Sequence, residues 1–382
     1  MLTTIGPNRD LRIDFFRGLA LWWIFTDHIP ANWIAQFSLR NFALCDATEI
    51  FVLLAGYAAG LAYGRTLEKH GWLFAAADVL RRAWVLYIVH IFLFVCFSAQ
   101  VSYSATRFDR ADYLDEIHLD VLAEAPYEAM LQALTLSFQP AYLNILPLYI
   151  TLLVYFSATL SLLKRPFVFI SISFSIYLLA RFFELNLPSW TGGGWYFNPF
   201  AWQLLFVIGA VLSTRNQFKF LHTYIYDIMA TIIILYGLCL VWLVWPYPEI
   251  EARFPQNIAW LLVSIDKEGL HPMRLLSILS FLWLVARFIP KSAQWLIGSF
   301  ARPFILCGQH SLPVFCCGIV LSFLARLAME QRSDWIVQAA VNLGGGAVMV
   351  GVATLAAWYK QKGREPRHRL PGLMDADNAG KR

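Results

Sequence analysis

Two apolar runs near the N-terminus contain five ionisable side chains, at Asp14, Arg17, Asp27, His28 and Glu49. An ionisable side chain in a lipid-spanning helix is costly, so each of them is a functional-site hypothesis. A carboxylate beside an imidazole raises its basicity and fixes its tautomer. The group therefore indicates general-base chemistry on a hydroxyl, with His28 as the base and the neighbouring carboxylates as its partners.

Arg17 and His28 share one face of the first run if that run is an α-helix. They are eleven residues apart, which places them within about 20° of each other around the helix and about 16 Å apart along its axis. Asp14 lies one turn before Arg17 and can pair with it. Pro30 cannot continue the helical ladder, so we expect the helix to end or bend just past His28.

The second run, 47–64, carries Glu49 at the same membrane level as His28. Three glycines at a spacing of four follow, which lets helices approach closely: Gly56, Gly60 and Gly64. Glu49 is seven residues before the first of them, so we expect its face to pack into the bundle. We expect Glu49 to orient His28, with Asp27 nearby, although a lone histidine in a membrane helix can simply bond a neighbouring carbonyl.

The elements that position these residues are membrane helices. The chain is 59% hydrophobic and 14% charged, whereas soluble domains are about 25% charged. Runs of about 20 apolar residues predict an all-α bundle of about ten spans: 13–33, 47–64, 83–102, 143–163, 166–185, 199–214, 224–245, 273–289, 303–325 and 335–358. The segment 127–140 can form an interfacial or re-entrant helix, which would be an eleventh membrane element.

The distribution of Lys and Arg predicts the topology. These residues concentrate before the first run, in every second connection and in the C-terminal tail, so the positive-inside rule places both termini in the cytoplasm. The net charge of +5 is therefore a topology signal and not evidence for nucleic acid. We expect one membrane domain over 1–360, a basic and disordered tail over 361–382, and no cleavable signal peptide.

The remaining features leave alternatives open. The six cysteines lack metal-like spacing, so we expect free thiols and no metal site. The acidic connection 103–126 is either a solvated loop or a lid over an outer site. The Gly- and Trp-rich connection 186–198 favours membrane-interface anchoring over stacking on sugars.

Residues 9–64, RDLRIDFFRGLALWWIFTDHIP…DATEIFVLLAGYAAGLAYG, closely resemble the OpgC family, whose members are implicated in succinylating osmoregulated periplasmic glucans. The resemblance continues in RRAWVLYIVHI (81–91), NILPLYI (144–150), FNPFAWQLLFVIGA (197–210) and QHSLPVFCCG (309–318). The chain also resembles the wider acyltransferase-3 group, in which an Arg, ten residues and a His mark the first helix. Two positions depart from that pattern, with Ala55 in place of a serine and Gln309 in place of a basic residue.

The resemblance implies transfer of an acyl group from cytoplasmic acyl-CoA to a hydroxyl of a periplasmic glucan, in the inner membrane of a bacterium. We expect succinyl-CoA as a donor substrate, no permanently bound cofactor, and direct transfer, because no Ser or Cys nucleophile motif is present. Arginines at the inner side suit the phosphates of CoA. The expected donor-binding residues are Arg12, Asp14, Arg17, Arg81, Arg82, His90 and His310.

Four polar residues at outer helix ends are candidates for binding the acceptor: Asp46, Asn144, Asn198 and Gln203. Helix capping or bonding between helices is the alternative for each. Lys267 could recognise a substrate carboxylate or be a surface lysine. Beyond an acyltransferase, two other classes stay open: a transporter or flippase whose buried charges form a path, and a structural partner of a glucan synthase. The predicted partners are membrane lipid, acyl-CoA and the glucan, with no nucleic acid.

Overall fold

The computed structural model describes residues 9–214, 224–251, 253, 255 and 265–362. Within this part the chain is all-helical, apart from one isolated bridge between Pro188 and Gly194. The main helices are α1 (Leu11–Asp27), α2 (Ala47–His70), α3 (Trp72–Phe108), α7 (Ile145–Thr159), α8 (Pro166–Phe182), α9 (Pro199–Thr214), α10 (Tyr224–Cys239), α13 (Pro272–Phe288), α14 (Ala301–Gln309), α15 (Ser311–Gln331) and α16 (Trp335–Lys362). The predicted all-α class is confirmed.

Six helical segments are long and apolar enough to cross a membrane: Ala47–His70, Trp72–Phe108, Ile145–Lys164, Tyr224–Val244, Ser311–Gln331 and Trp335–Lys362. The chain is therefore a multi-pass membrane protein. Two shorter apolar helices, α8 and α9, accompany them. Each expected apolar run overlaps a helix, whereas the count of ten spans and the cytoplasmic location of the termini stay predictions.

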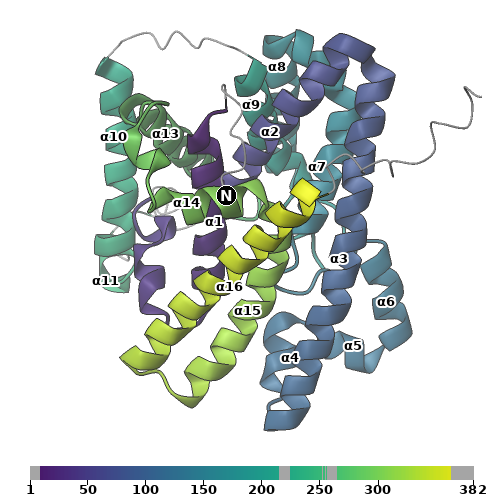
Figure 1. The fold of residues 1–382 in the computed structure, drawn as a ribbon, viewed down its shortest axis with the longest axis vertical. Helices are drawn as coiled ribbons and strands as arrows, with labels where there is room; N and C mark the ends of the chain where they lie inside the picture. The colour runs from purple at the N-terminus through teal and green to yellow at the C-terminus, as the bar shows by residue number, and fades with distance from the viewer. Residues whose placement is uncertain (1–8, 215–223, 252, 254, 256–264, 363–382) are drawn as a thin grey trace, which may run out of the picture.

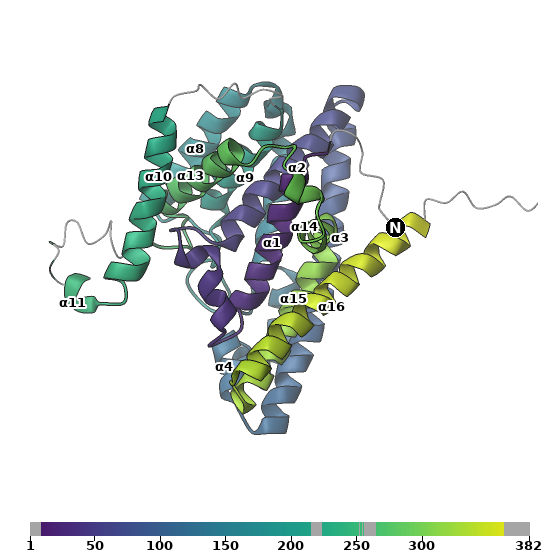
Figure 2. The same cartoon turned by 60° about the vertical axis from the view of Figure 1, so that its left-hand side comes forward.

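Small residues allow α1 and α2 to lie in the centre of the bundle, as Figures 1 and 2 show. A Cβ atom at Gly56 would lie 2.0 Å from the carbonyl oxygen of Phe206 in α9. A Cβ atom at Gly18 of α1 would lie 1.8 Å from the carbonyl oxygen of Phe304 in α14. Such contacts require glycine, because the backbones themselves touch. The expectation that the glycine face of the second run packs inside the bundle is confirmed at Gly56 and Gly60.

The acidic connection after α3 is structured. It folds into α4 (Asp112–Ile117), α5 (Asp120–Glu124) and α6 (Pro126–Leu134), which lie together beside the end of α3 (Figure 1). The buried Arg326 of α15 bonds Glu116 of α4 and also Glu330, at 2.7 Å. The connection is therefore not an irregular loop, yet Asp115, Glu116 and Glu124 remain exposed, so the solvated-surface and lid interpretations both stay predictions. Of the segment 127–140, only the part up to Leu134 is helical, as α6, and its placement relative to the membrane stays a prediction.

The segment between α1 and α2 is fixed against α16. Asn32 and Asn342 are buried and exchange two hydrogen bonds, of 3.0 and 2.9 Å. Gln338 adds a bond to the carbonyl oxygen of Ala31. These contacts set the position of the residues that immediately follow His28. In the predicted C-terminal tail, residues from Gly363 onward lie outside the described part of the chain.

Candidate active site

His28 is the C-cap residue of α1, and the backbone fixes its ring. Its Nδ1 atom lies 2.5 Å from the carbonyl oxygen of Ile24, one turn earlier. Because a carbonyl oxygen can only accept, Nδ1 carries the hydrogen and the neutral ring keeps its lone pair on Nε2. The ring also packs edge-on against Tyr142, with centroids 4.5 Å apart. His28 is therefore held in one orientation and one tautomer.

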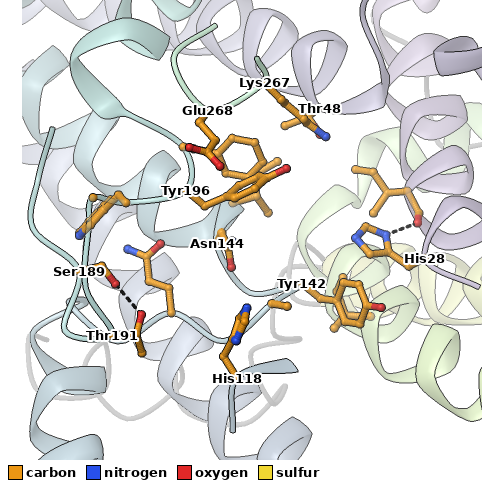
Figure 3. A pocket seen from close by; sticks show the side chains of 18 of the residues that line it. His28, Thr48, His118, Tyr142, Asn144, Ser189, Thr191, Tyr196, Lys267 and Glu268 are labelled. Carbon is orange, nitrogen blue, oxygen red and sulfur yellow. Dashed lines mark hydrogen bonds between the residues drawn. The ribbon is translucent and has the colours of Figure 1, made fainter. Parts of the chain in front are cut away.

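A cavity of about 440 Å³ opens beside His28 (Figure 3). Hydroxyl, carboxamide and charged side chains lie in its wall together with aromatic rings. This mixture suits a sugar, because hydroxyls need polar partners while the faces of the ring stack on aromatic side chains. The polar and aromatic lining residues are His28, Thr48, His118, Gln139, Tyr142, Asn144, Ser189, Thr191, Trp195, Tyr196, Phe197, Lys267, Glu268 and Phe315.

The connection 186–198 forms one wall of this cavity. The side chain of Asn186 donates to the carbonyl oxygen of Trp195, at 2.8 Å, and the Trp190 amide donates to Ser137. Trp195 is buried, whereas Tyr196 is 42% exposed and faces the cavity. Because several residues of this connection line the cavity, stacking on a sugar is compatible with its position, and membrane anchoring stays a prediction.

Glu49 has a different partner from the one we expected. It is fully buried, and Arg274 of α13 donates to its Oε1 at 2.6 Å. Its Oε2 accepts from the Asp46 amide in a capping box at the start of α2. Among the described contacts the backbone carbonyl of Ile24, and not Glu49, orients His28. Asp27 lies 3.5 Å from Arg40, so it too is turned to another partner.

Asp46 connects this ion cluster to the cavity. Its Oδ2 lies 2.7 Å from Lys267 and 3.1 Å from Arg274, while its Oδ1 accepts from the Thr48 amide. Burial acts to raise the pKa of Asp46, but the charges of Lys267 and Arg274 outweigh burial and hold it below its ordinary value. Asp46 is not among the lining residues, so it acts as a helix cap and as a support for Lys267.

Of the other candidate acceptor residues, Asn144 alone lines the cavity, and its buried Oδ1 lacks a partner among the described residues. Asn198 donates to the Leu185 carbonyl oxygen and caps α9 through the Phe200 amide. Gln203 donates to the carbonyl oxygen of Ser173 in α8. The capping and interhelical alternatives therefore describe Asn198 and Gln203.

Residues expected to bind the donor gather around the other half of α1. Arg17 donates to the Leu54 carbonyl oxygen of α2 at 2.8 Å, and lies within electrostatic reach of Arg82 and Tyr149. Asp14 pairs with Arg9 at 2.6 Å, and not with Arg17 as expected. A cationic region thus lies along α1, about 16 Å from His28.

Four further candidates make other contacts. Arg12 pairs with Asp10 and donates to the Ile289 carbonyl oxygen. Arg81 is largely exposed on α3 beside Asp78. His90 is fully buried, and both its ring nitrogens lack a partner among the described residues. His310 lies half-buried at the start of α15. None of these contacts assigns the four residues a role.

Several cavity residues escaped the sequence-based prediction. His118 caps the C-terminus of α4 with a φ angle of 58°, and Tyr142 has a φ angle of 72° in the segment before α7; no local sequence signal indicated either conformation. The surface-lysine alternative for Lys267 does not fit its side chain, which is 27% exposed and ion-paired with Asp46. Across the described ranges, no group of three or more His, Cys, Asp or Glu side chains is arranged to hold a metal ion.

A family model with the description OpgC protein matches residues 9–361. This range runs from just before α1 to the last turn of α16. The comparisons with curated proteins and with solved structures give no match.

Proposed function

Since this chain belongs to the OpgC protein family, we propose that it is a membrane O-acyltransferase that modifies a periplasmic glucan. The donor is an acyl-CoA, with succinyl-CoA as the expected substrate, and the acceptor is a glucan hydroxyl. The proposal places the protein in a bacterial inner membrane with both termini in the cytoplasm. The observation that carries it is His28, whose Nδ1 is fixed by the Ile24 carbonyl oxygen beside a polar and aromatic cavity.

The cavity would receive the sugar from the outer side. Tyr196 offers an exposed aromatic face, and Thr191, Glu268 and Gln139 offer hydrogen-bonding groups around it. Exposed aromatic rings and carboxylate or hydroxyl groups are the elements that a neutral carbohydrate needs. The acceptor hydroxyl would then lie beside Nε2 of His28 within this cavity.

The donor would enter from the opposite end of α1. Arg17 and Arg82 would supply positive charge for the phosphates of CoA. Arg12 and Arg81 are further residues proposed to contribute charge at this end. The separation between Arg17 and His28, about 16 Å along the helix, suits an extended pantetheine arm. His90 and His310 are the further residues proposed to line its path.

The chemical step is a direct transfer. Nε2 of His28 accepts the proton of the acceptor hydroxyl while its oxygen attacks the thioester carbonyl carbon. The tetrahedral oxyanion collapses, the C–S bond breaks, and the CoA sulfur leaves with the proton returned by the imidazolium. The products are the glucan ester and CoA-SH. Asn144, at the N-terminus of α7 and in the cavity wall, is the residue proposed to donate from its Nδ2 to the oxyanion.

The direct test combines the purified protein in lipid nanodiscs with succinyl-CoA and a neutral glucan. Release of CoA-SH together with a mass gain of one succinyl group on the glucan is the expected result. Binding of CoA should also raise the melting temperature, because a ligand that binds the folded state stabilises it. A protein that moves glucan across proteoliposomes without consuming acyl-CoA would instead be a transporter.

A further inference from the structure

A lysine faces the cavity that contains His28. Among the described residues that line the cavity, Lys267 is the one lysine or arginine, and Figure 3 shows its side chain beside Thr48. It comes from the segment that precedes α13, in a chain region remote in sequence from α1. The mechanism described above leaves Lys267 without a role.

The surroundings of Lys267 hold its ammonium charged and in place. Asp46 lies 2.7 Å from its Nζ, and the ring of Phe197 lies below it, 5.6 Å from Nζ to the centroid. Burial acts to lower the pKa of Lys267, but the charges of Asp46 and Glu49 outweigh burial and raise it. The side chain therefore carries a positive charge at neutral pH.

The hydrogen-bonding capacity of this ammonium is only partly used. It has three N–H donors, and Asp46 is its ion-pair partner among the described residues. Asp46 also forms an ion pair with Arg274, and Arg274 forms another with Glu49. The two negative charges of the cluster are therefore matched by two positive charges. Within the described part of the chain, Lys267 therefore keeps N–H donors that Asp46 does not use, on a side chain that lines the cavity.

We propose that Lys267 binds a carboxylate of the substrate inside this cavity. This inference rests on the proposed function, because it assumes that an acyl group and a glucan meet at His28. The carboxylate has two conceivable sources: the free end of a dicarboxylic acyl group, or an acidic substituent on the glucan. Glu268 is the other charged side chain in this part of the wall. Its carboxylate can accept hydrogen bonds from sugar hydroxyls, and it would repel an anion bound close to it.

The test compares succinyl-CoA with butyryl-CoA, which has the same four acyl carbons but lacks the carboxylate. Lys267→Gln should lower kcat/KM for succinyl-CoA by about 10- to 100-fold, as expected for one charge-assisted hydrogen bond. The rate with butyryl-CoA should change less than about twofold, because no anion is lost there. Lys267→Arg should retain part of the succinyl preference. Lys164→Gln, at an exposed lysine outside the cavity, is the matched control.

A second arm repeats the measurement with both donors on a neutral glucan and on a glucan that carries acidic substituents, which gives four combinations. If Lys267→Gln lowers kcat/KM only with the acidic glucan, the carboxylate belongs to the glucan. If it lowers kcat/KM only with succinyl-CoA, the carboxylate belongs to the acyl group. An equal loss with all four combinations, or no loss with any, overturns the inference. Absence of transfer by the unaltered protein from every acyl-CoA would instead refute the proposed function.

Discussion

The Nδ1 atom of His28 lies 2.5 Å from the carbonyl oxygen of Ile24, within the last turn of α1. This contact assigns the ring hydrogen to Nδ1 and keeps Nε2 available as a base, without help from a carboxylate. A backbone carbonyl carries no full charge, so the imidazole receives orientation but little extra basicity. The nearby carboxylates Glu49 and Asp46 form ion pairs with Arg274 and Lys267 instead of bonding His28.

Glu49→Gln should lower stability much more than it lowers catalysis. The Glu49 carboxylate is fully buried and bonded to Arg274, and breaking a buried ion pair costs about 3 kcal/mol or more. Thermal unfolding in nanodiscs measures the loss, and the transfer rate per folded molecule should stay within about threefold of the unaltered protein, or about 0.65 kcal/mol. Unchanged stability with abolished transfer would show instead that Glu49 serves His28 directly.

Asp46→Asn should show a stability deficit that depends on pH. The folded-state pKa of Asp46 lies below its unfolded-state value of about 3.9. Its contribution to stability is therefore fully present above about pH 5 and is lost as the pH falls through the unfolded and then the folded value. The gap in melting temperature between the two proteins should be widest near pH 7 and narrow below about pH 4.

The matched control for that experiment is Asp115→Asn, at an exposed carboxylate in α4. Its melting temperature should equal that of the unaltered protein at each pH. A gap for Asp46→Asn that stays constant down to acid pH would contradict an ionic role and leave only its helix-capping bond to Thr48.

Gly18→Ala should disrupt the crossing of α1 and α14. The added methyl group would lie 1.8 Å from the Phe304 carbonyl oxygen, so the two helices must separate. Overpacking of this kind costs about 1–3 kcal/mol, and more where backbone atoms collide. Gly344→Ala is the control, because its Cβ would meet no atom within 4 Å. Equal melting temperatures for the two variants would contradict the close approach of the helices.

Local patterns were enough to predict the helical class and the packed glycine face. Runs of apolar residues fix where helices form, and the spacing of Gly56 and Gly60 marks a close contact whichever helix provides it. The same patterns indicated His28 as a candidate, because a histidine within an apolar run is unusual, and the structure places it beside the cavity.

The sequence patterns did not predict which side chains form ion pairs with each other. Glu49 pairs with Arg274, a residue 225 positions later, and the chemical pattern around Glu49 is equally compatible with His28. The cavity wall depends on irregular segments, such as the one that places Tyr142 at a positive φ of 72°. Such segments are set by tertiary contacts, and apolar periodicity carries no information about them.

The most direct test of the account is the succinyl transfer rate of His28→Gln in nanodiscs, measured with saturating succinyl-CoA and glucan. His70→Gln, which changes an exposed histidine at the end of α2, is the matched control. Loss of a general base predicts a rate about 10²- to 10⁴-fold below that of the unaltered protein, with CoA still raising the melting temperature. A His28→Gln protein that transfers succinyl as fast as the control would contradict the central claim.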